Sequence, residues 1–457
     1  MAKIIIVGGG MSGMSAAWYI KKLRPDYEVT VLEASDRPGG KAYTHSEQGF
    51  LCERGVNGVL DNKPSTLGLA SELGVEPLRS RDAARRRFIV KEGRLAPLPE
   101  SPQSFLTSPL LSIPARLRVV LEAVIPEGDP NIDESLADFA RRRLGKEAFS
   151  YLIDPMSSGI YAGDPERLSL KSCFPRIYEL EHTYGSLIRA MLKLKRKAAA
   201  EGKEGPGAGP GGVLTSFRNG MSEMADCLAR KLGDSLRLGS RVKAIRRTDQ
   251  GWMAELENGD AEEGTHMVLS CPAHTAAEIT SKSAPGVAEC ASAIPYPPLA
   301  VICLGFRNGD AKQDLDGFGF LAPSCENRKI LGALWDSSIF ENRAPEGFHL
   351  IRSLVGGARQ AELATLPDER LTDIVIKECR ELMGMNKLPE FTSVFRWKRA
   401  IPQYNVGHER IMNRLKKELA ELPGLMVRCN YVGGVSLNDC VANSKALAEE
   451  ICKGNPG

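Results

Sequence analysis

The strongest chemical signal in the sequence is a glycine fingerprint near the N-terminus. Gly8, Gly10 and Gly13 follow the pattern GxGxxG. In this pattern the first glycine permits a tight turn, the second lets the backbone approach a pyrophosphate, and the third lets a helix pack closely on a strand. Glu33 stands 20 residues after Gly13 and can accept hydrogen bonds from ribose hydroxyls. We therefore predict a dinucleotide site made by Gly8, Gly9, Gly10, Met11, Ser12, Gly13, Glu33 and Ala34.

The elements needed to position these residues surround the fingerprint. Residues 3–7 predict a buried parallel strand, residues 15–23 an apolar helix, and residues 27–35 a second strand. The N-terminus of the helix would direct free N–H groups and the positive end of its dipole at the phosphates. This order of strand, turn, helix and strand indicates a Rossmann-like α/β domain.

A second glycine-rich stretch, RPGGKAYT at residues 37–44, favours FAD over NAD as the dinucleotide. It resembles the paired glycines and basic residue that follow the acidic strand end in flavoproteins with two dinucleotide-binding motifs. The predicted contacts there are Arg37, Gly40 and Lys41. A further glycine turn, in YVGGVSLND at residues 431–439, opens a predicted helix whose dipole would face the flavin ring.

Composition bounds the class of protein. A chain of 457 residues is too long for one small core and suggests two or three domains. Its 42% hydrophobic and 26% charged residues are typical of a soluble globular protein. The net charge is only +3, and the basic runs lack the interleaved aromatic residues of a nucleic-acid binder. We therefore expect no nucleic-acid partner.

The cysteines and the N-terminus bound the compartment. Eleven cysteines are scattered singly, without CxxC, and no histidine–cysteine spacing suits zinc. We expect reduced thiols, a cytoplasmic location and no metal site. The apolar run at the N-terminus is too short for a signal peptide, and no stretch approaches the roughly 18 apolar residues of a spanning helix.

A basic, helical character marks residues 85–211. Between residues 79 and 200 there are 21 Lys and Arg against 15 Asp and Glu. Residues 201–212 are rich in glycine and predict a flexible linker. From the residues alone, this region could face a membrane or carry solvated charges, and both interpretations stay open. A predicted helix places four apolar side chains on roughly one face: Ile113, Leu117, Val120 and Val124.

Four longer motifs carry a family resemblance over nearly the whole chain. They are SGIYAGDPERLSLKSCFP at 158–175, DGFGFLAP at 316–323, IPQYNVGH at 401–408 and GVSLNDC at 434–440. In this order they are similar to motifs of the oxygen-dependent porphyrinogen oxidases of haem synthesis, within the monoamine-oxidase-like flavoproteins. The segment GIYAGD followed by LS and CFP is the most specific of them.

The resemblance implies a mixed α/β fold with three domains. It also implies a peripheral membrane protein on the cytoplasmic side, a homodimer, and hand-over of the product to the next enzyme of the haem pathway. The implied domains are an FAD-binding domain from 1–75, 212–275 and 392–457, a substrate-binding domain from 76–84 and 276–391, and a helical membrane-facing domain at 85–211.

The chemistry implied by the resemblance is a six-electron oxidation of protoporphyrinogen IX to protoporphyrin IX. FAD would be bound non-covalently, and O2 would accept the electrons and leave as H2O2. The pyrroles already activate the meso C–H groups, so we expect no catalytic side chain, only a dry pocket that holds a methylene carbon against the flavin. Coproporphyrinogen III is the open alternative substrate. Another flavin oxidase or desaturase of the amine-oxidase type, and a non-catalytic FAD-containing membrane scaffold, are the rival interpretations.

The roles known for the family fall on matching positions in this sequence. Arg87 would hold a substrate propionate, whereas its neighbours Arg85 and Arg86 would face solvent or the membrane. The apolar contacts to the macrocycle would come from Gly159 beneath the ring, Phe318 and Leu321 as a sandwich, and Leu354 at the far wall. Further cofactor contacts would come from Gly55, Val56, Asn57 and Gly58 in a flavin loop, Val242 near the adenine, Trp397, and the backbone of Val435, Ser436 and Leu437.

Overall fold

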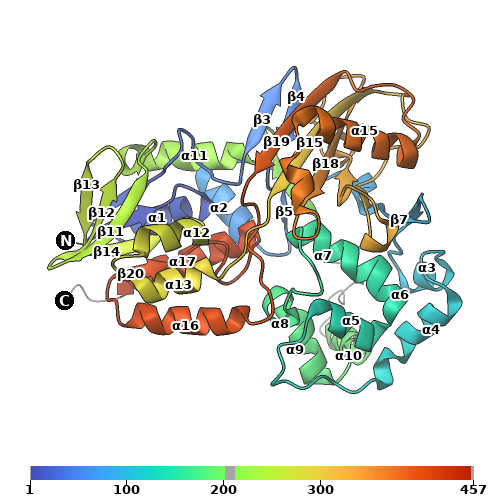
Figure 1. Cartoon of the computed structure of the whole chain (residues 1–457), viewed down its shortest axis with the longest axis horizontal. Coiled ribbons are helices and arrows are strands. Elements are labelled where there is room, and N and C mark those ends of the chain that lie inside the picture. Colours follow the sequence, from blue (N-terminus) through green and yellow to red (C-terminus); the bar gives the residue numbers. More distant parts are fainter. Residues whose placement is uncertain (1, 201–211, 454–457) are drawn as a thin grey trace.

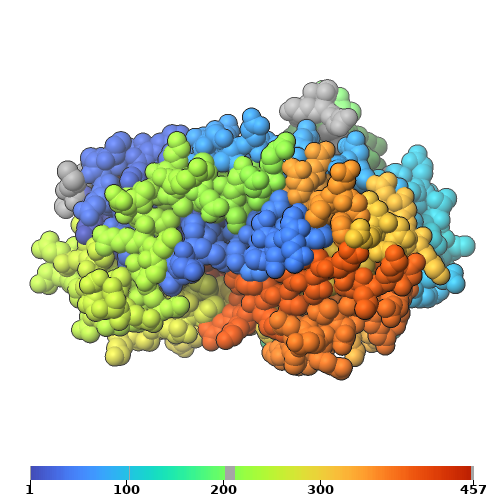
Figure 2. Space-filling model, turned by 90° about the horizontal axis from the view of Figure 1, so that it is seen from above, coloured from blue at the N-terminus to red at the C-terminus, as the bar shows by residue number. Residues whose placement is uncertain are grey.

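A computed structural model of the chain describes residues 2–200 and 212–453. It has three parts: a nucleotide-binding part around a parallel sheet, a larger mixed sheet, and a helical region beneath that sheet (Figure 1). Seen from above, the strands near residues 240–270 and the helices near residues 110–120 lie at opposite ends of the long axis (Figure 2). The predicted mixed α/β fold class is confirmed.

The nucleotide-binding part is built on a five-stranded parallel sheet in the order β10-β2-β1-β14-β20. Both faces are buried, since Ile4 and Ile6 belong to one hydrophobic cluster and Ile5 and Val7 to another. A fully buried sheet explains the continuous apolar run of β1. The strands are β1 (Lys3–Val7), β2 (Glu28–Leu32), β10 (Leu236–Arg237), β14 (His266–Leu269) and β20 (Leu425–Val427).

These strands come from the three distant segments that the predicted cofactor domain combines, although the outer boundaries of that domain stay predictions. The helices that follow or cover the strands are α1 (Met11–Leu23), α2 (Ser65–Leu73), α11 (Ser222–Leu232), α12 (Ala273–Thr280), α13 (Pro285–Ser292), α16 (His408–Ala420) and α17 (Leu437–Lys453). Smaller sheets are formed by β11 (Val242–Thr248), β12 (Gly251–Leu256) and β13 (Ala261–Gly264), by β3 (Thr44–Glu47) and β4 (Phe50–Glu53), and by β5 (Val59–Leu60), β9 (Leu214–Phe217) and β6 (Pro77–Arg79).

The larger sheet has seven strands in the order β19-β15-β18-β17-β16-β7-β8. Only the pair of β7 and β16 is parallel. Residue 85 is therefore too early a start for the predicted helical domain, because residues 87–97 form a hairpin of this sheet. The elements are β7 (Arg87–Lys91), β8 (Arg94–Pro97), β15 (Leu299–Arg307), β16 (Gly319–Leu321), β17 (Gly332–Leu334), β18 (Phe348–Gly356), β19 (Phe391–Trp397), α14 (Asp336–Ile339) and α15 (Asp368–Met383).

The helical region holds the predicted apolar face, and that face is exposed. Ile113, Leu117, Val120 and Val124 are 66%, 60%, 52% and 68% exposed. Most of the predicted linker, residues 201–211, lies outside the described residues. The helices are α3 (Pro102–Thr107), α4 (Ile113–Val120), α5 (Leu136–Leu144), α6 (Lys146–Ala148), α7 (Asp154–Tyr161), α8 (Leu170–Cys173), α9 (Pro175–Tyr184) and α10 (Leu187–Ala200).

Candidate cofactor and substrate site

The turn between β1 and α1 has the geometry of a phosphate-binding loop. Gly8 has a φ of +114°, a conformation that favours glycine. A Cβ on Gly13 would lie 2.1 Å from the carbonyl oxygen of Gly8, so α1 can approach β1 only because residue 13 has no side chain. Gly10 precedes α1 without a side-chain cap, and the first turn begins at Met11 and Ser12. Its N–H groups are therefore free to face an anion.

Glu33 closes the ribose end of this loop. One carboxylate oxygen of Glu33 accepts a hydrogen bond from the N–H of Gly9 (2.6 Å), and Ala34 beside it is exposed. The N–H of Ser240 donates to the carbonyl of Glu33 (2.7 Å), which brings the start of β11 to the same end. Val242 is buried there. Glu33 and Val242 thus lie at the same end of the loop, and their contacts with ribose and adenine stay predictions.

The turn that contains the paired glycines lies directly against the glycine loop. The N–H of Gly39 donates to the carbonyl of Gly9 (2.9 Å), and a Cβ on Gly40 would lie 3.1 Å from the Cα of Gly10. The close approach of the two loops therefore depends on glycine. The guanidinium of Arg37 donates to the carbonyl of Gly40 (2.9 Å), so it shapes this turn.

Lys41 is a half-buried cation between the loop and the sheet of the substrate part. Its Nζ lies 3.2 Å from the carbonyl oxygen of Arg399 and 4.3 Å from the centre of the Trp397 ring. Burial lowers the pKa of Lys41 to about 8, and the positive charge of Arg37 acts in the same direction. The indole N–H of Trp397 donates to the carbonyl of Arg54 (2.6 Å), which fixes the ring. A bound phosphate would supply the anion that Lys41 lacks.

The flavin loop packs against Lys41. A Cβ on Gly55 would lie 2.0 Å from the carbonyl oxygen of Lys41, and the N–H of Val56 donates to that oxygen (3.2 Å). Both amide atoms of Asn57, just before Gly58, are buried and have no hydrogen-bond partner among the described residues. Because buried polar atoms are almost always paired, Asn57 fits a site completed by a polar molecule such as a flavin.

The N-terminus of α17 completes the cofactor side. The Oγ of Ser436 accepts a hydrogen bond from the N–H of Asp439 (3.1 Å) and so caps the helix, with Val435 and Leu437 on either side. The Oγ of Ser444 donates to the carbonyl of Ser12 (2.8 Å), which holds α17 against α1. The first turn of α1 therefore packs on the middle of α17, and a common site for the positive ends of both helix dipoles stays a prediction.

The three clustered arginines divide into two surface residues and one inner residue. Arg85 and Arg86 are exposed and each forms an ion pair with an aspartate. Arg87, on β7, is partly buried, and burial lowers its pKa, although an arginine stays charged in proteins. Its guanidinium carbon lies 5.1 Å from the centre of the Phe318 ring, and its buried Nε has no partner among the described residues.

Gly159, Leu321 and Leu354 continue the wall that Arg87 and Phe318 begin. Gly159, on α7, is exposed, and a Cβ there would lie 3.0 Å from the Cδ2 atom of Leu321. Leu354, on β18, packs in the same apolar clusters as Trp397 of the cofactor side. The structure thus brings these predicted substrate residues to one wall that meets the cofactor side at Trp397.

Sequence reasoning missed an ion pair behind this wall. The carboxylate of Asp154, at the start of α7, accepts a hydrogen bond from Arg359, which lies 205 residues away. No local motif signals such a pair. The only pointer in the sequence is that Asp154 precedes the motif containing Gly159.

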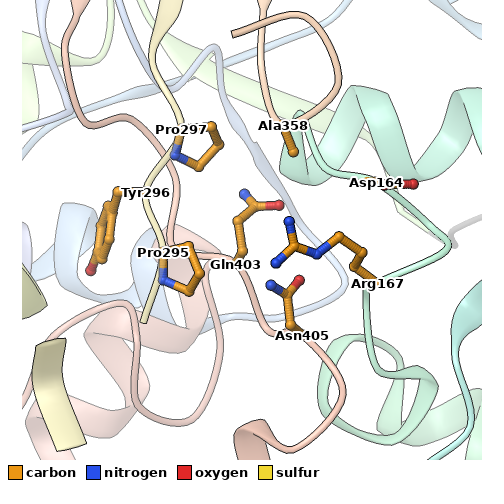
Figure 3. A pocket seen from close by; sticks show the side chains of 8 residues that line it. All are labelled: Asp164, Arg167, Pro295, Tyr296, Pro297, Ala358, Gln403 and Asn405. Atoms are coloured by element: carbon orange, nitrogen blue, oxygen red, sulfur yellow. The ribbon is translucent and has the colours of Figure 1, made fainter. Parts of the chain in front are cut away.

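A cavity of about 200 Å³ lies behind the wall, where the three predicted domains meet. It contains none of the predicted site residues. Figure 3 shows the side chains of Gln403, Arg167 and Asn405 converging on it. Gln403 Nε2 donates to the carbonyls of Tyr161 (2.9 Å) and Ile401 (3.0 Å), so the glutamine joins the end of α7 to the cofactor part.

Neither metal chemistry nor a membrane span is evident in the part of the chain that the structure describes. Within residues 2–200 and 212–453 there is no group of three or more metal-ligating side chains. Among the same residues no helix combines the length and apolar character that crossing a membrane requires.

Comparison with known proteins accounts for this arrangement. The model of a family described as flavin containing amine oxidoreductase matches residues 11–452. This chain belongs to that family. The chain is accordingly an FAD-dependent oxidoreductase, as the glycine fingerprint and the motifs predict.

The relatives refine the family. The chain is 30% identical to coproporphyrinogen III oxidase of Bacillus subtilis (strain 168), over 98% of this chain and 97% of the relative. It is 31% identical to a chloroplastic protoporphyrinogen oxidase of Oryza sativa subsp. japonica, over 98% and 88%. A solved structure assigned as a protoporphyrinogen oxidase, from Exiguobacterium sp. 255-15, has a TM-score of 0.83 at 26% identity and covers 99% of this chain and 98% of its own. The predicted resemblance to porphyrinogen oxidases is confirmed.

Proposed function

We propose that this flavoenzyme oxidises a porphyrinogen to a porphyrin, with protoporphyrinogen IX as its substrate. The observation that carries the proposal is the wall that joins Arg87 to Phe318, Leu321 and the exposed Gly159. An inner cation beside apolar side chains and a bare helix backbone suits a large apolar ring with carboxylate arms. The names of the relatives support the same substrate class.

The residues of the wall bind and orient the substrate. Arg87 holds a propionate and so fixes the rotation of the ring, while Gly159 and Leu321, which lie against each other, present an apolar surface to the macrocycle. Leu354 and Trp397 exclude water where the wall meets the cofactor side. Bound FAD supplies the acceptor for two electrons in each of three steps. Loss of six electrons and six protons from the substrate balances the reduction of three O2 to three H2O2.

Anaerobic mixing of the holoprotein with protoporphyrinogen IX tests the activity. Bleaching of the flavin absorbance, followed by porphyrin fluorescence when O2 is admitted, is the expected result. A flavin that stays yellow in the presence of porphyrinogen contradicts the proposal and favours the interpretation as a non-catalytic scaffold. Bleaching by amines instead favours the rival amine-oxidase interpretation.

Coproporphyrinogen III is the second candidate substrate. Two relatives, from Bacillus subtilis and Staphylococcus aureus, are named coproporphyrinogen III oxidase. This substrate has four carboxylates in place of two, and would call for additional cations around the ring. Parallel assays with both porphyrinogens decide between them, because the preferred substrate has the higher kcat/KM.

We further propose that FAD is bound non-covalently and that O2 is the acceptor. Cys440, three residues after the predicted flavin contact Leu437, is buried within α17, and burial raises the pKa of its thiol to about 11. A thiol of that kind is a poor nucleophile towards a flavin. Acid precipitation should release yellow flavin into the supernatant; colour retained in the pellet would show a covalent link.

The apolar face of α4 is our candidate for peripheral membrane contact. Its exposed side chains continue through Leu121, and two arginines, Arg116 and Arg118, lie on the same helix. The wild type should bind vesicles that contain phosphatidylglycerol. An Ile113→Ser, Leu117→Ser double variant should bind them roughly tenfold or more weakly. Leu388→Ser, at a site 65% exposed elsewhere, is the control. The cytoplasmic location, the homodimer and the hand-over of product stay predictions.

A further inference from the structure

The structure assigns a positioning role in substrate binding to Asp154 and Arg359, whose ion pair ties α7 to the strands that carry Leu321 and Leu354. The inference rests on the proposed function, because it concerns the wall against which the porphyrinogen would lie. Neither residue belongs to the predicted contacts.

The carboxylate of Asp154 is a junction of three elements. It is 1% exposed and begins α7, five residues before Gly159. One oxygen accepts from the guanidinium of Arg359. The other accepts from the N–H of Ser324 (2.7 Å). Ser324 follows β16, which ends at Leu321, and Arg359 follows β18, so one buried carboxylate connects α7 to both strands.

Arg359 also holds the next turn of α7. Its second nitrogen donates to the Oγ of Ser158 (2.5 Å), the residue before Gly159. One residue earlier in the chain, the N–H of Ala358 donates to the carbonyl of Ala162 (2.7 Å). The loop after β18 therefore grips α7 near its beginning, beside Gly159 and at its end.

The backbone of α7 explains why such a grip is needed. A π-helical turn, Phe149–Ile153, stands immediately before it, and Pro155 removes an N–H from its first turn. At its other end Ala162 has a φ of +46°, which terminates the helix. Regular helical hydrogen bonding therefore does not continue from α7 into the segments before and after it. Side-chain contacts from the sheet hold α7 in its position instead.

A helix positioned in this way controls the shape of the wall. A Cβ on Gly159 would lie only 3.0 Å from Leu321, so α7 packs directly on that side chain and a small shift of α7 changes the surface offered to the macrocycle. The cofactor contacts lie on other elements and would not move. We therefore expect loss of the ion pair to weaken substrate binding while the FAD content and the chemical step are preserved.

Kinetics and direct binding of Asp154→Asn and Arg359→Ala test this. Both variants should raise the KM for the porphyrinogen roughly 10-fold and leave kcat within about twofold. The Kd for the porphyrins, measured by fluorescence titration with protoporphyrin IX and coproporphyrin III, should rise by the same factor. Arg359→Lys should recover part of the affinity. Arg141→Ala, which breaks the exposed pair with Glu166, is the matched control and should leave both constants unchanged.

The milder variants keep the inference falsifiable where the buried substitution lowers the yield. Ser158→Ala removes only one of the contacts of Arg359 and should raise KM roughly threefold. A merely structural role would lower the yield and Tm without changing KM or porphyrin affinity of the folded protein, and that outcome would overturn the inference. A wild type that neither binds porphyrin nor bleaches under porphyrinogen would instead overturn the proposed function.

Discussion

The cofactor side and the substrate wall recognise their ligands by different means. The cofactor side is made largely of backbone from short turns, in which Gly8, Gly13, Gly40 and Gly55 permit close contacts. The wall is made of side chains from distant segments, of which Arg87 and Leu321 are examples. One added Cβ in the backbone turns should therefore abolish most of the cofactor affinity, whereas replacing one side chain of the wall should weaken substrate binding only in part. The four predictions below test this difference.

Gly13→Ala should have the largest effect. Its Cβ would lie 2.1 Å from a backbone oxygen, which cannot move aside as a flexible side chain can. We expect FAD affinity to fall by roughly 100-fold or more, since overpacking at a rigid contact costs about 3 kcal/mol. The flavin absorbance of the purified protein measures this.

Gly68→Ala is the matched control for that variant. Gly68 lies in α2, and nothing stands within 4 Å of the position of a Cβ there. Alanine should stabilise the helix by up to about 1 kcal/mol, with full FAD content. If Gly13→Ala also kept its flavin, the idea of a cradle that tolerates no side chain would be wrong.

Arg87→Ala should raise the KM for the porphyrinogen about 10- to 100-fold and lower kcat much less. A charge-assisted hydrogen bond contributes about 1.5–3 kcal/mol, and this one fixes orientation without chemistry. Steady-state kinetics measures the change, with Arg85→Ala as the control, because Arg85 is exposed and pairs with the exposed Asp82. Equal KM values for the two variants would show that Arg87 does not bind the substrate.

FAD affinity should fall as the pH rises above about 8. Burial lowers the pKa of Lys41 to about 8 in the protein without a bound anion, and a pyrophosphate would raise it. The attraction is therefore complete below pH 8 and is lost as the pH rises towards the higher pKa of the complex. At pH 9 the affinity should be roughly 10-fold weaker. Cys429, its nearest thiol, has a pKa raised by burial to about 12 and does not titrate in this range.

Lys41→Arg checks the origin of that pH dependence. Arginine remains charged throughout, so the affinity of this variant should be flat between about pH 7 and 9.5. Titration of the FAD-free protein with FAD at several pH values gives the comparison. A slope that survives in the variant would assign the effect to another group.

Gly159→Ala should have the smallest effect. The added Cβ meets the flexible end of Leu321 at 3.0 Å, which can shift slightly. We expect the KM to rise about threefold with the flavin retained, a cost below 1 kcal/mol. Loss of flavin in this variant would show that the two regions are not independent.

The same difference explains what the sequence could predict. The predicted strand at residues 3–7 coincides with β1, and Gly8 and Gly13 lie as expected, because a turn and its glycines are adjacent in the chain. The apolar face of α4 was predicted from spacing, and the structure adds that this face is exposed. These features depend on local patterns that a sequence displays directly.

Features that join distant segments escaped prediction. The domain boundary at residue 85 was wrong because β7 pairs with β16, which lies beyond the whole helical region. The contact between Asp154 and Arg359 is of the same kind. By contrast, the outward position of Arg85 and Arg86 was predicted, and both side chains are exposed. Pairings between remote strands leave no periodic trace in either strand.

The parallel pairing of β7 with β16 also bears on how the chain folds. The pairing of Arg87 in β7 with Gly319 in β16 can form only after residue 319 has been synthesised. The pairing of β14 with β20 likewise requires residues 425–427. Such long-range pairings slow folding, because a large loop must close before any contact stabilises it. During synthesis, the β7–β8 hairpin and the apolar face of α4 would emerge long before the seven-stranded sheet is complete. We expect folding to be complete only after β20 has been synthesised, with a nascent chain that depends on chaperones until then.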